Sequence, residues 1–240
     1  QATPGNDVLI GYSTADDIRG LEGRDRLYGR AGGDTLDGGA GNDQLYGETG
    51  NDTYLFGRGF GYDIVIDQDN TAGNLDTILL DPDITPNDVD LKRSGDDLIL
   101  SINDTNDKIT VNNWFLNESN EYQVERIQFA DGTVWDAAAV KLLVLQGTSD
   151  DDVLIGYSTA DSIQGLEGND QIYGYAGDDT IDGGAGHDEI DGNAGNDELF
   201  GGADNDTIYG DAGDDYLDGG HHIQIGCIEY FYKKYSSKSL

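Results

Sequence analysis

The chain has 240 residues and a net charge of −35, from 48 acidic against 13 basic residues. So acidic a surface makes nucleic acid and anionic membranes poor partners, and a compact fold with this charge would repel itself unless a cation neutralised it. The single Cys227 allows no intramolecular disulfide, and no apolar run approaches the length of a membrane-inserting segment. Methionine is absent, which indicates a fragment or a processed product.

Residues 1–55 repeat with a period of nine. The clearest copy of this repeat lies later in the chain, GGAGHDEID at residues 183–191, where Gly occupies positions 1 and 4, Asp position 6 and an apolar residue position 8. Residues 1–55 contain six such repeats. Their position-6 residues are Asp7, Asp16, Asp25, Asp34, Asp43 and Asp52, and their position-8 residues are Leu9, Ile18, Leu27, Leu36, Leu45 and Tyr54.

Residues 56–146 lose this period, apart from an echo at residues 61–65, and carry ordinary β signals. Residues 76–80 and 107–115 each read as a strand, and residues 88–102 as two strands around a turn at 94–97. Residues 124–135 form a predicted hairpin, with Asp131-Gly132 as its turn. Residues 137–145 suit a short helix or a strand. This segment holds both tryptophans, Trp114 and Trp135, and can bury a small core.

Residues 147–220 resume the period with eight further repeats. The sequence of residues 7–16 recurs at 152–161, an offset of 145, so a larger unit of repeat block and intervening segment begins a second time. The position-6 residues of this block are Asp152, Asp161, Asp170, Asp179, Asp188, Asp197, Asp206 and Asp215. Position 4 is not Gly at Thr14, Asp150, Thr159 and Asp204, and the second repeat of each block fits the pattern least well.

Residues 221–240 form a C-terminal tail that differs abruptly in composition. It caps the last coil, carries a secretion signal, or is an artefact of expression or reading frame, and the sequence leaves these three interpretations open. His221 and His222 are adjacent, and without other ligands they do not suggest a metal site.

The repeat predicts an all-β fold of turns and short strands. Position 8 points inward, its neighbours point outward, and two consecutive repeats close one coil. Each coil buries too few apolar side chains to offset the cost of ordering its backbone. A ligand must therefore stabilise the coil.

Ca²⁺ suits this role, because it binds six to eight oxygens in irregular geometry. Aspartates two repeats apart would share an ion with the main-chain carbonyls of their turns. An isolated Asp would be read as a solvated turn residue, but fourteen in register favour a metal site. Mg²⁺ suits it less well. Up to about ten ions are expected, between the pairs Asp7/Asp25, Asp16/Asp34, Asp25/Asp43, Asp34/Asp52, Asp152/Asp170, Asp161/Asp179, Asp170/Asp188, Asp179/Asp197, Asp188/Asp206 and Asp197/Asp215.

The repeats resemble the RTX (haemolysin-type) calcium-binding β-roll, and the intervening segment resembles the haemolysin-type calcium-binding-related β domain. The resemblance implies two parallel β-roll blocks flanking a small, mostly antiparallel β domain. It also implies a Gram-negative bacterial protein, secreted or at the cell surface, that uses the type I secretion machinery and folds on Ca²⁺ outside the cell. The oligomeric state is not indicated.

Two other functions compete with a purely calcium-binding role. Catalysis is not expected from this chain, because residues 56–146 contain no His or Cys; a lipase, protease, epimerase or toxin domain could lie elsewhere in a longer protein. His187 occupies position 5, where any residue is allowed. A glycan- or surface-binding role would use the exposed position-9 tyrosines Tyr28, Tyr46, Tyr173 and Tyr209, although these, like Trp114 and Trp135, better suit packing.

Overall fold

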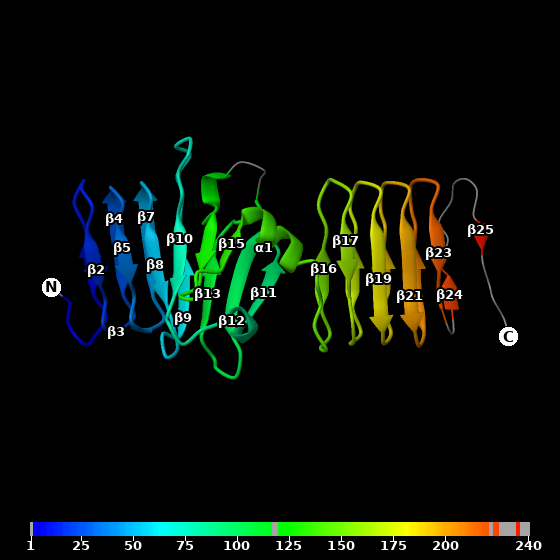
Figure 1. Ribbon diagram of the computed structural model, residues 1–240, viewed down its shortest axis with the longest axis horizontal. Coiled ribbons are helices and arrows are strands. Elements are labelled where there is room, and N and C mark those ends of the chain that lie inside the picture. Colours follow the sequence, from blue (N-terminus) through cyan, green and yellow to red (C-terminus); the bar gives the residue numbers. More distant parts are fainter. Residues whose placement is uncertain (1, 117–119, 221–222, 226–233, 236–240) are drawn as a thin grey trace. The chain divides into compact units, whose positions relative to one another are not determined.

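The computed structural model describes residues 2–116, 120–220, 223–225 and 234–235. It divides into two compact units, Gln1–Lys141 and Leu142–Leu240, each built from stacked coils (Figure 1). The predicted all-β class is confirmed. The parallel stacking of coils two repeats long is confirmed as well, because Leu9 pairs with Leu27 and Leu27 with Leu45.

In the first unit, two sheets form opposite sides of the coils. The first sheet has the order β1 (Val8–Ile10), β4 (Arg26–Ala31), β7 (Gln44–Thr49), β9 (Tyr62–Val65), β13 (Lys108–Val111), β12 (Asp97–Ile102) and β11 (Val89–Ser94). The second has the order β15 (Val134–Asp136), β14 (Arg126–Gln128), β10 (Thr77–Leu80), β8 (Thr53–Phe56), β5 (Thr35–Asp37) and β2 (Asp17–Arg19). The short strands β3 (Glu22–Gly23) and β6 (Ala40–Gly41) pair between turns.

The coils continue past the point where the nine-residue period stops. Strand β9 pairs in parallel with β7, and β10 pairs in parallel with β8. Strands β13 and β14 add a further parallel layer. Antiparallel pairing begins only beyond them, in β11–β12, β12–β13 and β14–β15. The segment that we expected to be mostly antiparallel is therefore mixed, and it shares both of its sheets with the first roll block.

The expected elements of this segment are otherwise present. Strands β10, β13 and the β11–β12 and β14–β15 hairpins lie where the sequence placed them. Residues 137–145 contain the helix α1 (Ala137–Leu143), which follows an N-cap in which Asp136 Oδ1 accepts a hydrogen bond from Ala139 N at 2.8 Å. Two 3-10 turns complete the segment, η1 (Pro86–Asp88) and η2 (Asn120–Tyr122).

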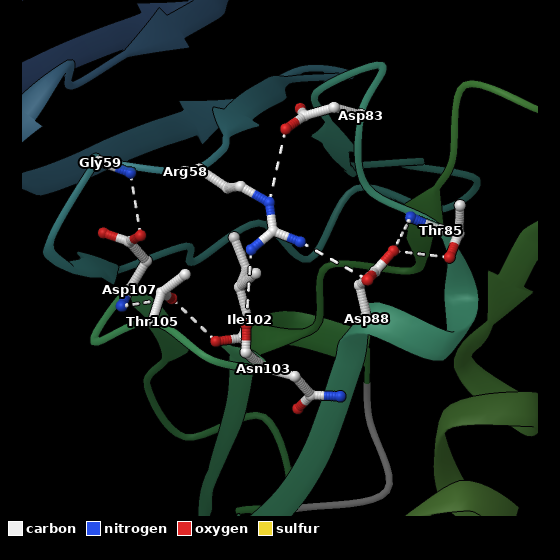
Figure 2. Close-up of polar contacts among 9 residues, drawn as sticks. All are labelled: Arg58, Gly59, Asp83, Thr85, Asp88, Ile102, Asn103, Thr105 and Asp107. Carbon is white, nitrogen blue, oxygen red and sulfur yellow. Dashed lines mark hydrogen bonds and ion pairs between the residues drawn. The ribbon is translucent and has the colours of Figure 1, made fainter.

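A clasp of polar contacts, shown in Figure 2, holds the loop after β8 against the β11–β12–β13 sheet. The guanidinium of Arg58 lies 3.4 Å from Asp83 and 3.5 Å from Asp88. The carboxylate of Asp107 accepts hydrogen bonds from the main-chain N–H groups of Gly59 and Gly61, both at 2.8 Å. The clasp fixes the chain where it leaves the regular repeat.

The second unit is a regular roll. One sheet has the order β16 (Val153–Ile155), β18 (Gln171–Tyr173), β20 (Glu189–Asp191), β22 (Asp206–Tyr209) and β24 (Ile223–Ile225). The other has the order β17 (Ser162–Gln164), β19 (Thr180–Ala185), β21 (Glu198–Ala203), β23 (Tyr216–Asp218) and β25 (Lys234–Tyr235). All of these pairings are parallel. The described parts of the tail thus extend both sheets, whereas His221, His222 and Cys227 lie outside the described residues.

The core of each roll is a narrow file of position-8 side chains. Leu27, Leu36, Leu45 and Tyr54 are fully buried in the first unit. Leu145 precedes the file of the second unit, which consists of Leu154, Ile163, Ile172, Ile181, Ile190, Leu199, Ile208 and Leu217. Leu9, in the first coil, is only half-buried. The predicted inward position is thereby confirmed.

Candidate metal centre

The position-6 aspartates form a continuous ladder along each side of the coils. In each step, the main-chain N–H of one Asp donates a hydrogen bond to Oδ1 of the Asp one coil later, at 2.7 to 3.1 Å. All ten expected pairs are brought together in this way. The coil-to-coil spacing therefore places successive carboxylates where one ion between two turns could reach both.

The ladder extends further than the nine-residue period. Asp43 N donates to Asp63 Oδ1 at 2.9 Å, and Asp52 N donates to Asp76 Oδ1 at 2.7 Å. Asp76 N in turn donates to Glu125 Oε2 at 2.7 Å. Asp63, Asp76 and Glu125 were not predicted from the sequence, because loops lengthen these coils. A usable signal existed, since each acid stands two residues before a buried apolar residue, namely Val65, Ile78 and Ile127.

The second carboxylate oxygen gives the test for a metal. Inside the rolls the ladder aspartates are at most 2% exposed, and Oδ2 of most of them is buried without a hydrogen-bond donor. A buried carboxylate oxygen without a donor is strongly disfavoured, and a cation in the gap would satisfy it. The residues present therefore fit Ca²⁺. The aspartates with such an Oδ2 include Asp25, Asp34, Asp43, Asp52, Asp63, Asp179, Asp188, Asp197 and Asp206.

The first coil of each block differs. There Oδ2 accepts a hydrogen bond from the main-chain N–H four residues earlier, from Tyr12 to Asp16 at 2.6 Å and from Thr148 to Asp152 at 2.7 Å. Asp7 and Asp161 are bonded in the same way. Because Oδ2 of these four carboxylates already has a donor from the protein, they need a cation less than the inner aspartates do.

Glycine at position 1 provides the space for the carboxylate. A Cβ at Gly183 would meet Asp188 Oδ2 at 2.5 Å, closer than real contacts allow. Glycine is needed at position 4 for a different reason: a Cβ at Gly186 would collide with the carbonyl oxygen of Gly168 in the preceding coil. Position 2 is more permissive, and residues such as Leu21 and Tyr175 adopt positive φ there with exposed side chains.

Burial shifts the titration of the ladder. Desolvation raises the pKa of Asp43 and Asp188 to about 6. A backbone hydrogen bond to each carboxylate opposes this shift, and the charges of neighbouring aspartates add to it. The same cause raises the pKa of Asp52 to about 7 and that of Asp63 to about 8. The metal-free gaps thus hold negative charge poorly, which is the environment in which a divalent cation is most favourable.

The ions would draw on main-chain oxygens as well as aspartates. Among the residues that the structure describes, no three acidic, His or Cys side chains gather in a geometry that could hold a metal by themselves. Two carboxylates per gap leave most of the six to eight positions of Ca²⁺ to carbonyl oxygens and water.

Position 5 carries a second, outer ladder that the repeat pattern did not predict. Asn169 Oδ1 accepts from His187 N at 2.9 Å, and Asn6 and Asp178 accept in the same way from residues two repeats later. The Nδ1 atom of His187 lies 3.1 Å from the main chain of Asn205. His187 is thereby part of an exposed ladder between coils.

The position-9 tyrosines and both tryptophans are partly or fully buried. The rings of Tyr28 and Tyr46 stack with centroids 4.5 Å apart, and the position-9 tyrosines are half-buried, where we expected exposure. Trp114 is 1% exposed and donates from Nε1 to Val124 O at 3.0 Å. Trp135 packs edge-on against Phe129, with centroids 4.7 Å apart.

A parallel β-solenoid with acidic ladders between its turns defines a class of calcium-binding repeat protein. The RTX calcium-binding nonapeptide repeat matches residues 1–27, 19–54, 28–62, 144–163, 155–190 and 191–220, which is more than half of the chain. The chain therefore belongs to the RTX calcium-binding repeat family. Residues 97–139 match the haemolysin-type calcium binding protein related domain.

A curated relative is similar to part of the chain. The iron-regulated protein FrpA of Neisseria meningitidis serogroup C is 43% identical over 108 residues, which is 45% of this chain and 10% of the relative. The match thus spans about a tenth of the length of that protein.

Two solved structures show a partial likeness. The AlgE6R3 subunit of a mannuronan C5-epimerase from Azotobacter vinelandii is 25% identical, with a TM-score of 0.36 over 56% of this chain and 82% of that one. The extracellular lipase LipA from Serratia marcescens is 17% identical, with a TM-score of 0.27 over 90% of this chain and 31% of that one.

In the described residues, no helix has the length and apolar character needed to cross a membrane.

Proposed function

We propose that this chain is a non-catalytic module that folds when Ca²⁺ fills the gaps of its aspartate ladders. The observation that carries this proposal is the file of buried Oδ2 atoms without donors along the inner turns. Within the nonapeptide repeats each of these atoms lies beside a position-1 glycine, where the protein supplies space but no hydrogen-bond donor. The ions would be held by the ladder aspartates and by main-chain oxygens of the adjoining turns.

Calcium would then act as a folding switch. A ligand that binds only the folded state stabilises it by RT ln(1 + [L]/Kd) at each site, and the narrow position-8 core leaves the roll dependent on that contribution. The chain would remain unfolded in the low calcium of a cytosol and fold outside the cell. This behaviour suits a secreted or surface-exposed bacterial protein that uses type I secretion, with any catalytic or toxic activity carried by another part of a longer protein.

A glycan-binding role is less well supported. The Tyr28 and Tyr46 rings face each other with an interplanar angle of 11°, so each covers a face that a sugar ring would need. Both rings are half-buried along the strand face, which favours a role in shielding the sheet.

Calcium titration followed by far-UV circular dichroism tests the proposed function. The full chain in EGTA should show little β signal from the second roll, and millimolar Ca²⁺ should restore it cooperatively. Mg²⁺ at the same concentration is the control, because it prefers strict octahedral geometry and retains its waters. A spectrum that does not respond to Ca²⁺ would overturn the proposal.

A further inference from the structure

Asp67 is a buried acid that the nine-residue repeat does not explain. It follows β9 in the first unit, is 1% exposed, and has no hydrogen-bond donor at either carboxylate oxygen. Ladder aspartates have at least Oδ1 satisfied by a main-chain N–H, so Asp67 is more completely deprived of donors than they are. A buried carboxylate in this state needs a proton or a cation.

The strand register explains where its side chain goes. Strand β9 pairs with β7 so that Val65 lies opposite Leu45, and Ile66 N donates to Leu45 O at 2.9 Å. Two residues further on, the same register aligns Asp67 with Gly47. At Gly47 the space for a Cβ is taken by Oδ2 of Asp52 and the hydroxyl of Tyr54. Asp67 thus carries a side chain at a register where the repeat carries glycine.

The neighbours of Asp67 supply further oxygens. Its carboxyl group contacts that of Asp76, and the other charged groups acting on it, Asp52 and Glu125, are also acids. Asp76 Oδ2 accepts from Asn74 Nδ2 at 2.5 Å. This contact leaves Asn74 Oδ1 buried and without a donor. Asp67, Asn74 and Asp76 thus form one cluster of oxygen-bearing side chains, in which both oxygens of Asp67 and Oδ1 of Asn74 have no donor, whereas both oxygens of Asp76 accept a hydrogen bond.

We propose that Asp67 and Asp76, with the side-chain oxygen of Asn74, bind a divalent cation at a site outside the nonapeptide repeats. An all-oxygen donor set of carboxylates and an amide suits a hard cation, and the irregular loop geometry suits Ca²⁺ better than Mg²⁺. Two carboxylates and one amide oxygen do not complete the coordination, so main-chain oxygens or water would supply the remainder. The site would tie the loop of residues 66–76 to the Asp52–Asp76 step of the ladder.

A shared proton is the competing state. Two carboxyl groups in contact can hold one proton between them instead of a cation. The two states differ in a measurable way, because only the cation adds the mass of a metal and requires both carboxylates to ionise.

Native mass spectrometry of the full chain with Ca²⁺ distinguishes these states. Asp67→Asn should bind one ion fewer than the unsubstituted chain. Asp67→Gly should do the same, and it should fold because the aligned Gly47 has no side chain. Asp69→Asn is the matched control: Asp69 is also buried, at 4% exposed, but its carboxylate accepts from Gly50 N at 3.0 Å and Thr71 N at 2.8 Å. The control should keep the full number of ions.

The outcome also separates this inference from the proposed function. If both Asp67 variants bind as many ions as the unsubstituted chain, the extra site is wrong and the shared proton stands. Asp188→Asn, in the second unit, tests the repeat sites by the same count. A loss in the Asp67 variants without a loss in Asp188→Asn would support the extra site while contradicting calcium binding by that ladder.

Discussion

Asp188 takes part in two steps of one ladder: its Oδ1 accepts from Asp170 N at 2.9 Å, and its own N–H donates to Asp206 Oδ1 at 3.1 Å. Its Oδ2 has no donor. Asp188 therefore stands between two gaps, each of which could hold an ion, and its loss would affect both.

Replacing Asp188 should weaken calcium-dependent folding more than replacing Asp7 does. Asp188→Asn should raise the Ca²⁺ concentration needed for folding, since each ion lost removes about 2.7 kcal/mol when calcium is present at about 100 times Kd. Asp7→Asn should have a smaller effect, because Asp7 is half-buried and its Oδ2 already accepts from Thr3 N and Oγ1. The midpoints of calcium titrations followed by circular dichroism would measure both. Equal shifts would contradict the sharing of ions between coils.

How far the sequence alone predicts the structure depends on the regularity of the coil. The ten Asp pairs followed from the period because every coil between them is two repeats long. The pairing of Asp63 and Asp76 was not predicted, because they lie 20 and 24 residues after their partners. Where a loop lengthens a coil, the sequence period no longer gives the register, which is seen only from the strand pairing. The hydrogen bonds to Oδ2 of Asp16 and Asp152 in the first coils were also not predicted, because the repeat motif is the same at the ends of a block as in its middle.

Acid should stabilise the metal-free fold. The pKa values of Asp179, Asp188 and Asp197 are raised to about 6 by burial in the fold, against about 3.9 when unfolded. The folded state thus binds more protons between these values, and its stability falls as pH rises from about 4 to about 6. In EGTA, the β signal should be larger at the lower end of this window than at pH 8.

Calcium should reverse this pH dependence. Ca²⁺ binds the ionised carboxylates, so its apparent affinity should rise with pH through the same window. Asp188→Asn is the control, because an amide does not titrate, and it should flatten the slope measured in EGTA. A metal-free chain whose β signal grows with pH would show that burial does not govern these groups.

Glycine at residue 186, a position-4 residue, should be required by the preceding coil. Gly186→Ala should destabilise the folded, calcium-bound chain by more than about 2 kcal/mol, since its Cβ would overlap the carbonyl oxygen of Gly168. Gly73→Ala is the matched control: Gly73 also has positive φ, at 84°, but a Cβ there would have nothing within 4 Å. The free energy of unfolding of Gly73→Ala should fall by only about 1 kcal/mol, from backbone strain. Urea denaturation in saturating Ca²⁺ measures both, and similar losses would assign the effect to φ alone.

The clasp in Figure 2 should depend more on Asp107 than on Arg58. Arg58 is about one-third exposed and pairs with Asp83, which is 64% exposed, so Arg58→Ala should cost about 1 kcal/mol or less. Asp107 is 9% exposed and accepts from two main-chain N–H groups. Asp107→Ala would leave both donors unsatisfied, at about 1–3 kcal/mol for each. Hydrogen exchange at Gly59 and Gly61 reports on the clasp directly: it should accelerate strongly in Asp107→Ala and weakly in Arg58→Ala. The reverse order would mean that the ion pairs, and not the buried acceptor, hold this loop against the sheet.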